Sequence, residues 1–97
     1  MIRLGPALRK QDLVGEVAIK TGLSKVQAGD AVEAVLSTIE STLSQGGSVQ
    51  LTGFGTFEVR HRKARRGHSF SGEGAVEIPA QDVPVFRPGK SLKEAVK

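Results

Sequence analysis

The segment that decides the fold reads GFGTFEVRHRKARRG, residues 53–67. In its first half, apolar side chains at Phe57 and Val59 alternate with charged ones at Glu58 and Arg60, which is the period of a half-buried β-strand. Its second half, residues 60–66, holds five Lys or Arg side chains and no acid. We therefore predict a strand that begins in a core and ends as a cationic surface.

The neighbouring segments supply partners for this strand. Residues 49–51 alternate and Thr52-Gly53 is typical of a turn, so a hairpin with residues 57–62 is expected. Extended character returns at residues 76–79 and 83–86, where prolines favour edges or bulges. We predict that residues 57–62 and 76–79 are the two legs of a long hairpin, whose outer part forms an arm over about residues 60–79. Because an isolated two-stranded ribbon is marginal in water, this arm should be mobile without a partner.

Helical patterns flank these strands. Apolar residues recur at helical spacing from Gln11 until Thr21-Gly22 supplies a stop signal, and Ser24-Lys25-Val26-Gln27 matches a capping box that starts a second helix. This helix should end at Gly46-Gly47, and Pro88 fits the first turn of a short terminal helix.

The predicted fold class is α+β. It comprises two N-terminal helices, a three-stranded antiparallel sheet with a protruding β-ribbon arm, and a short C-terminal helix, with residues 10–97 as a single domain. Residues 1–9 show no usable period and contain Gly5-Pro6, so we expect a flexible extension and assign no function to it.

Length and composition exclude several classes of protein. Ninety-seven residues amount to one small domain, and 38% hydrophobic residues without cysteine give a modest core that no disulfide reinforces. Help from a second subunit is therefore expected. The longest apolar runs are far too short for a membrane span or a signal sequence, so we expect a soluble, cytoplasmic protein. Zinc fingers and thiol nucleophiles are excluded because cysteine is absent.

The charge is unevenly distributed along the chain. The net charge is +4, yet residues 1–48 contain five basic and five acidic side chains and so contribute nothing to it. The second half has nine Lys or Arg against five Asp or Glu, and five of the nine lie in residues 60–66. For a run of two or three basic residues, a charged surface in contact with solvent would be a sufficient explanation. A cluster this dense favours a polyanionic partner.

From Lys10 to Lys97 the sequence resembles the bacterial histone-like HU/IHF family of DNA-bending proteins. The most specific matches are GFGTFEVR at residues 53–60, RKARRG at 62–67, IPA at 78–80 and VPVFRPGKSLK at 83–93. The resemblance implies an intertwined homodimer or heterodimer with a helical base, a sheet that forms a saddle for the duplex, and two arms that enter the DNA minor groove.

The resemblance also implies which residues contact DNA. Arg62, Arg65 and His68 match positions where arm contacts are usual, and Lys10, Lys90 and Lys93 match or adjoin saddle lysines, although solvated surface charge explains these lysines equally well. Neutral His68 adds no charge above its usual pKa of about 6.5, so modest pH sensitivity is expected. The complete set of predicted DNA-binding residues is Lys10, Arg60, Arg62, Lys63, Arg65, Arg66, His68, Phe70, Lys90 and Lys93.

The arm tip departs from the family pattern. Where the family usually has Asn-Pro, with the proline wedged between base pairs, this chain has Ser69-Phe70. An aromatic ring is itself a wedge that unstacks bases. We therefore predict that Phe70 is the intercalating residue. The alternative is that Phe70 packs against its own arm or a neighbouring molecule.

The other aromatic residues are expected to be structural. Phe54, Phe57 and Phe86 are predicted to lie in the core or the dimer interface; the rival function, a base-stacking platform, needs exposed aromatics on neighbouring strands. No metal site is expected, because His61 and His68 have no third ligand nearby. Neither an enzymatic activity nor a cofactor nor a small-molecule substrate is predicted.

These features predict a non-enzymatic, nucleoid-associated protein that binds double-stranded DNA with little sequence specificity and bends and compacts it. A homodimer is expected, with a heterodimer as the alternative. Three other functions stay open: a sequence-selective IHF-like heterodimer subunit, an RNA-binding module, and an interaction protein whose basic arm docks on an acidic partner.

Overall fold

The computed structural model describes residues 5–68 and 75–97. Two helices come first, α1 (Lys10–Thr21) and α2 (Lys25–Ser44). The predicted capping box is present: the Ser24 hydroxyl accepts from the Gln27 N–H, and the Gln27 side-chain oxygen accepts from the Ser24 N–H, both at 3.1 Å. At the end of α1, Gly22 takes the left-handed conformation with φ 76°, which glycine adopts without steric cost.

The predicted three-stranded antiparallel sheet follows, in the order β1 (Val49–Leu51), β2 (Gly55–Arg62), β5 (Gln81–Pro88). Both neighbours of β2 run antiparallel to it, and Phe57 faces Val49 on one side and Phe86 on the other. The proline-containing strand β5 lies at an edge, as expected for residues that lack a backbone donor.

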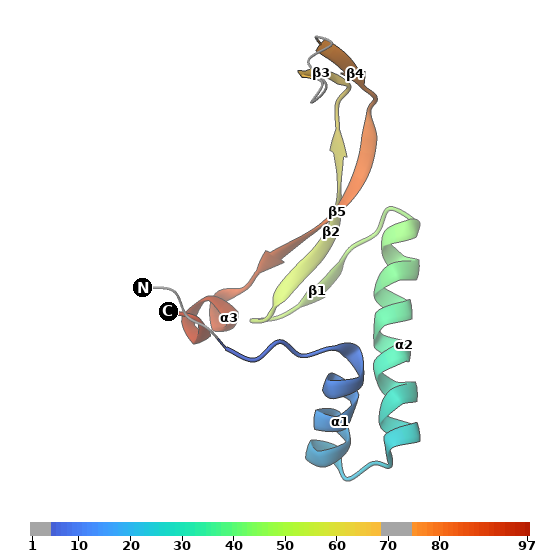
Figure 1. Ribbon diagram of the computed structural model, residues 1–97, viewed down its shortest axis with the longest axis vertical. Helices are drawn as coiled ribbons and strands as arrows, with labels where there is room; N and C mark the ends of the chain where they lie inside the picture. Colours follow the sequence, from blue (N-terminus) through green and yellow to red (C-terminus); the bar gives the residue numbers. More distant parts are fainter. Residues whose placement is uncertain (1–4, 69–74) are drawn as a thin grey trace. The chain divides into compact units, whose positions relative to one another are not determined.

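Beyond the sheet, β3 (Arg65–His68) pairs with β4 (Ala75–Ile78) and forms the predicted arm (Figure 1). Arg62 faces Gln81 and, three residues further, Arg65 faces Ile78, so β2–β5 and β3–β4 are one continuous ribbon without an inserted residue. Residues 57–62 and 76–79 lie on the two legs of this ribbon, as predicted, and the direct partners of residues 57–62 are residues 81–86. The sequence pattern did not identify the beginning of β5, because Gln81 and Asp82 are polar and interrupt the apolar pattern.

The chain ends in α3 (Lys90–Ala95), and Gly89 precedes its first turn. Pro88 is the last residue of β5, so its predicted place in the helix was wrong. The reason is a close backbone approach: the Gly89 N–H donates to the Phe54 carbonyl at 2.7 Å, and a Cβ on Gly89 would lie 2.5 Å from the Gly53 carbonyl oxygen. The turn before β2 therefore holds the start of α3 in place.

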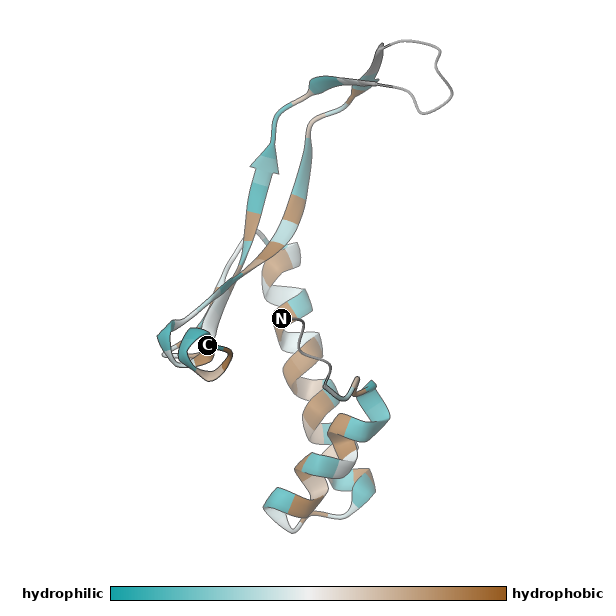
Figure 2. Ribbon diagram, turned by 60° about the vertical axis from the view of Figure 1, so that its left-hand side comes forward, coloured by the Kyte–Doolittle hydropathy of each residue, from teal (hydrophilic) through white to brown (hydrophobic). Residues whose placement is uncertain are grey.

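Few side chains are buried. The chain divides into two compact units after Thr38, inside α2. Among the described residues, Ala28 and Val32 are the only buried hydrophobic side chains, whereas Val35 is 57% exposed. Figure 2 shows hydrophobic positions along both helices and a ribbon that is mostly hydrophilic away from the sheet. Within the described part of the chain, no helix has the length and apolar character that crossing a membrane requires.

Candidate nucleic-acid interface

The outer half of β2 carries the first basic side chains of the arm. Alternation along the strand places Arg60 and Arg62 on one face, opposite Val83 and Gln81 of β5. These partners are short or uncharged, so they leave the guanidinium groups exposed. The strand pairing therefore leaves these cations exposed at the outer end of β2.

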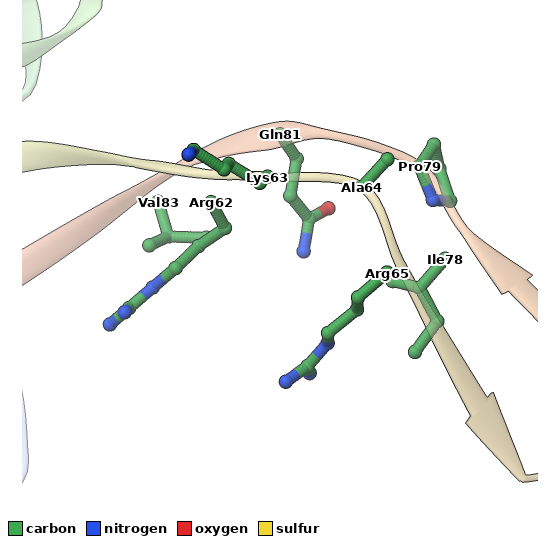
Figure 3. A pocket seen from close by; sticks show the side chains of 8 residues that line it. All are labelled: Arg62, Lys63, Ala64, Arg65, Ile78, Pro79, Gln81 and Val83. Carbon is green, nitrogen blue, oxygen red and sulfur yellow. The ribbon is translucent and has the colours of Figure 1, made fainter.

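The ribbon is interrupted at Lys63 and Ala64, which belong to no strand. Across the ribbon lies Pro79, which has no N–H to donate, and this explains why the hydrogen-bonded ladder stops there. Strict alternation would place Arg62 and Arg65 on opposite faces. Instead both line one open hollow (Figure 3), and this pair of guanidinium groups is brought together by the interruption.

The basic side chains at this interruption have no acidic partner among the described residues. Within residues 5–68 and 75–97, no carboxylate lies within ion-pairing distance of Arg62, Lys63 or Arg65. All three are exposed. Unpaired guanidinium and ammonium groups on an exposed ribbon are suited to phosphate oxygens, because no internal ion pair has to be broken first.

Three other side chains of the arm have acidic partners across or along the ribbon. Arg66 Nε lies 3.4 Å from a Glu77 carboxylate oxygen, and both side chains are more than 70% exposed. His61 Nδ1 lies 2.8 Å from Asp82. Arg60 is 3.9 Å from Glu58. Exposed pairs of this kind contribute about 0–1 kcal/mol, so a polyanion can displace them.

Aromatic packing dominates the base of the ribbon. The Phe86 ring centroid lies 4.7 Å from that of Phe57 and 5.8 Å from that of Phe54. A Cβ on Gly55 would lie 2.4 Å from the Phe86 ring, so glycine is required for this close contact. The predicted structural role fits this cluster, but Phe54 is 49% and Phe86 37% exposed in the single chain.

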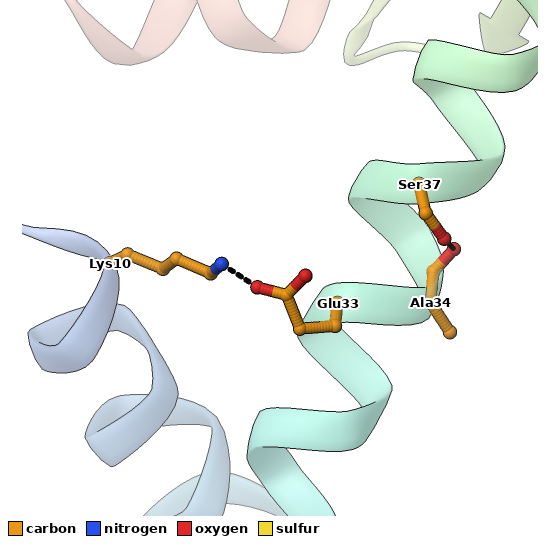
Figure 4. A network of polar contacts seen from close by, with 4 residues as sticks. All are labelled: Lys10, Glu33, Ala34 and Ser37. Carbon is orange, nitrogen blue, oxygen red and sulfur yellow. Dashed lines mark hydrogen bonds and ion pairs between the residues drawn. The ribbon is translucent and has the colours of Figure 1, made fainter.

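The lysines predicted to form the saddle occupy different settings. Lys10, at the start of α1, forms an ion pair with Glu33 of α2 (Figure 4). Lys90 and Lys93 are exposed on α3, and Lys93 borders an open hollow with Gln50 and Thr56 of the sheet. The roles of all three in DNA contact remain predictions.

Some of the predicted interface lies outside the described residues. Phe70 is in the segment 69–74, and His68 is placed only as the last residue of β3. Conversely, sequence reasoning missed Gln81, whose side chain enters the hollow beside Arg62, and Arg87, whose Nε lies 2.6 Å from Glu58. Cross-strand register was the missing signal, because only register places residue 81 opposite residue 62.

The described part of the chain offers a cation-rich surface for binding. Within the described ranges, no group of three or more His, Cys, Asp or Glu side chains is arranged to hold a metal ion. The exposed basic hollow along a projecting two-stranded ribbon defines a surface for a polyanion.

Comparison with known proteins identifies the class. The family model "Bacterial DNA-binding protein" matches residues 8–97, so the chain belongs to this family of DNA-binding proteins, which are not enzymes. Within it the chain is of the HU type. It is 52% identical over 88 residues to the DNA-binding protein HU of Streptococcus pyogenes, covering 91% of this chain and 97% of that protein. For the Staphylococcus aureus HU the identity is 48% over 90 residues, covering 93% and 100%.

Solved structures agree with this assignment. HU of Anabaena, determined in a cocrystal with DNA, matches with a TM-score of 0.87 at 44% identity, covering 92% of this chain and 97% of that one. HU from Thermotoga maritima matches with a TM-score of 0.67 at 34% identity, covering 93% and 100%. The α+β fold with its β-ribbon arm is thus the HU fold.

Proposed function

We propose that this HU-family protein is an architectural DNA-binding protein that uses the arm to grip the minor groove of double-stranded DNA and bends it. The single observation that carries the arm's role is the hollow at the interruption of the ribbon, where Arg62 and Arg65 point to one side without acidic partners among the described residues. Contacts to phosphate position a protein without reading sequence, so little sequence specificity follows.

The binding unit we propose is a homodimer. With only Ala28 and Val32 buried among the described hydrophobic side chains, the single chain lacks the core that a domain of this size needs. Phe54, Phe86 and Val35 are exposed large hydrophobic residues that a second copy would cover. A dimer also provides two arms, which doubles the number of phosphate contacts.

Binding should proceed by electrostatic capture followed by insertion at the arm tip. Lys and Arg side chains release condensed counterions when they neutralise phosphates. Insertion of Phe70, which lies outside the described residues, would then unstack a base step in exchange for more wrapped contacts. The site of action that we propose is the bacterial chromosome, in the cytoplasmic nucleoid.

The first test measures affinity for plain, nicked and four-way-junction DNA against salt, with RNA as competitor. If two arms and the saddle neutralise about six to ten phosphates, raising salt from about 50 to 200 mM should weaken binding by roughly 10³ to 10⁵. An affinity that hardly depends on salt contradicts the proposal. Preference for single-stranded RNA would favour the RNA-binding alternative, and strong discrimination against random DNA would favour an IHF-like subunit.

The second test concerns the wedge. The bend angle and affinity of Phe70→Ala are compared with those of the parent protein on nicked duplex, where bending is easiest. We expect a smaller bend, because alanine cannot fill an unstacked step. Equal bend angles would assign Phe70 to packing within the arm.

A further inference from the structure

One face of the sheet carries a carboxylate between two arginines. Alternation along β2 places Glu58 and Arg60 on the same face, and the register with β5 places Arg87, opposite Thr56, on that face as well. Arg87 is the diagonal neighbour of Glu58, within reach of a long side chain. Its Nε lies 2.6 Å from Glu58 Oε1, and an Arg60 Nη lies 3.9 Å from the same oxygen. One carboxylate oxygen is therefore shared by cations from two strands.

These three side chains differ in burial. Glu58 is 25% exposed, whereas Arg60 is 51% and Arg87 is 62% exposed. The Glu58 Oε1 atom itself is buried and makes no hydrogen bond of regular geometry within the described ranges, so the ion pairs are what compensates its charge. The acid is thus the fixed member of the cluster, and the arginines are the members that reach solvent.

The ion pair through Nε leaves most of the donors of Arg87 available. Within residues 5–68 and 75–97, Arg87 has no side-chain partner other than Glu58. A guanidinium group has five N–H donors, and those on its two Nη atoms form the fork that binds a phosphate with two parallel hydrogen bonds. Because Glu58 holds the Nε end, the long side chain loses rotamer freedom before a ligand arrives.

The surroundings of Arg87 favour an anion. Arg87 borders an open hollow with Gln50, Thr56 and Lys93, and none of the described residues that line this hollow is acidic. Gln50 faces Thr56 across β1 and β2, and Thr56 faces Arg87 across β2 and β5, so the three residues form one row over the sheet. A phosphate bound at Arg87 would therefore be close to amide, hydroxyl and ammonium donors.

We propose that Glu58 is a positioning residue for DNA binding, which holds the guanidinium group of Arg87 in place to receive a phosphate of the duplex. An acidic side chain then supports the binding of a polyanion, although its own charge opposes it. Arg60, at the longer distance, is held only weakly. The inference rests on the proposed function, because it requires a duplex as ligand.

The sign of one affinity change tests this role. Two arginines and one glutamate give the cluster a charge of +1, and neutralising Glu58 raises it to +2. Charge alone therefore predicts tighter binding to DNA. Loss of positioning predicts weaker binding, because ordering one long side chain costs roughly two- to tenfold in affinity. In a dimer this loss occurs twice.

Glu58→Gln keeps the shape of the side chain and removes its charge. The affinity of the full-length protein for a nicked duplex is measured by fluorescence anisotropy at low salt, and we expect binding about fivefold weaker than that of the parent. The matched control Glu77→Gln removes the same charge from an exposed acid and should raise affinity about two- to threefold. Tighter or unchanged binding by Glu58→Gln overturns the positioning role.

A double-mutant cycle assigns the effect to Arg87. Arg87→Ala should weaken binding about tenfold and lower the salt slope by about one per protomer. Adding Glu58→Gln to Arg87→Ala should raise affinity about twofold, since without the arginine only the repulsive charge is removed. A purely structural role of Glu58 would lower affinity in both backgrounds, and that result also overturns the inference.

The outcomes separate this inference from the proposed function. A parent protein that binds no duplex overturns both, whereas the wrong sign for Glu58→Gln overturns only the positioning role. Circular dichroism at the temperature of the binding assay checks that each variant is folded. If Glu58→Gln does not fold, Arg87→Lys replaces it, because lysine keeps the charge and lacks the fork. We expect about threefold weaker binding for Arg87→Lys, and parental affinity would overturn the inference.

Discussion

The base of the ribbon, formed by β2 and β5, and its outer part beyond Arg62 share one strand register. Their side chains differ, because those at the base pack against each other and those of the outer part are exposed. At the base, the tilted rings of Phe57 and Phe86 pack with their centroids 4.7 Å apart, and Glu58 forms an ion pair with Arg87 at 2.6 Å. Beyond Arg62, the described basic side chains are exposed and several lack partners. Backbone pairing thus provides a common scaffold. Stability is concentrated where side chains contact each other, and we propose that DNA binds where the basic side chains are exposed.

The largest effect should come from removing an aromatic ring at the base. Phe86→Ala deletes both ring contacts and should lower the free energy of unfolding by roughly 3 kcal/mol, as for other large aromatic truncations. Urea unfolding followed by circular dichroism measures this. Arg65→Ala in the outer ribbon is the control and should stay within about 0.5 kcal/mol of the parent. Equal losses for the two variants would contradict the division between base and outer ribbon.

For Arg62 and Arg65, which line the hollow, we expect a large loss of DNA affinity and little change in stability. Arg62→Ala combined with Arg65→Ala should weaken duplex binding by roughly 10- to 100-fold and lower the salt slope by about two per protomer, because two phosphate contacts are lost. Lys20→Ala combined with Lys25→Ala removes the same charge from the helices and should have little effect. Salt titrations by fluorescence anisotropy compare the two. If the helix variant loses as much affinity, net charge and not the arm controls binding.

A smaller effect is expected from neutralising the acid at the base. Glu58 is only 25% exposed and lies between Arg60 and Arg87, so Glu58→Gln should cost about 1 kcal/mol of unfolding free energy. Thermal melting at constant pH measures the change. A gain in stability would show that desolvating the half-buried carboxylate costs more free energy than its ion pairs with Arg60 and Arg87 contribute.

The smallest effect on stability is expected from neutralising Glu77, the acidic residue of the outer ribbon. Glu77→Gln releases Arg66 from an exposed ion pair, so unfolding should change by less than about 0.5 kcal/mol while DNA affinity rises about two- to threefold. Anisotropy titration at low salt detects this gain. Weaker DNA binding would indicate that the pair is needed to hold the β3–β4 ribbon in shape.

Much of the fold was readable from local patterns. The capping box at Ser24 and Gln27, the stop at Gly22 and the alternation of residues 57–62 each act through neighbours in the chain, so each predicted its element correctly. The cationic cluster was likewise visible as composition. The family motifs around Phe54 and Phe86 led to the HU fold, which the comparisons confirm.

The rest depended on contacts between distant residues. Cross-strand register alone placed Gln81 opposite Arg62, and an interruption opposite Pro79 brought Arg62 and Arg65 to one side against the alternation of a regular strand. Backbone contact with Gly53 set the start of α3 after Pro88. The sequence by itself determined which elements form and where positive charge accumulates, because periodicity, capping and composition are local. Only the tertiary structure decided which side chains share a surface, since that depends on pairing between segments that no local pattern encodes.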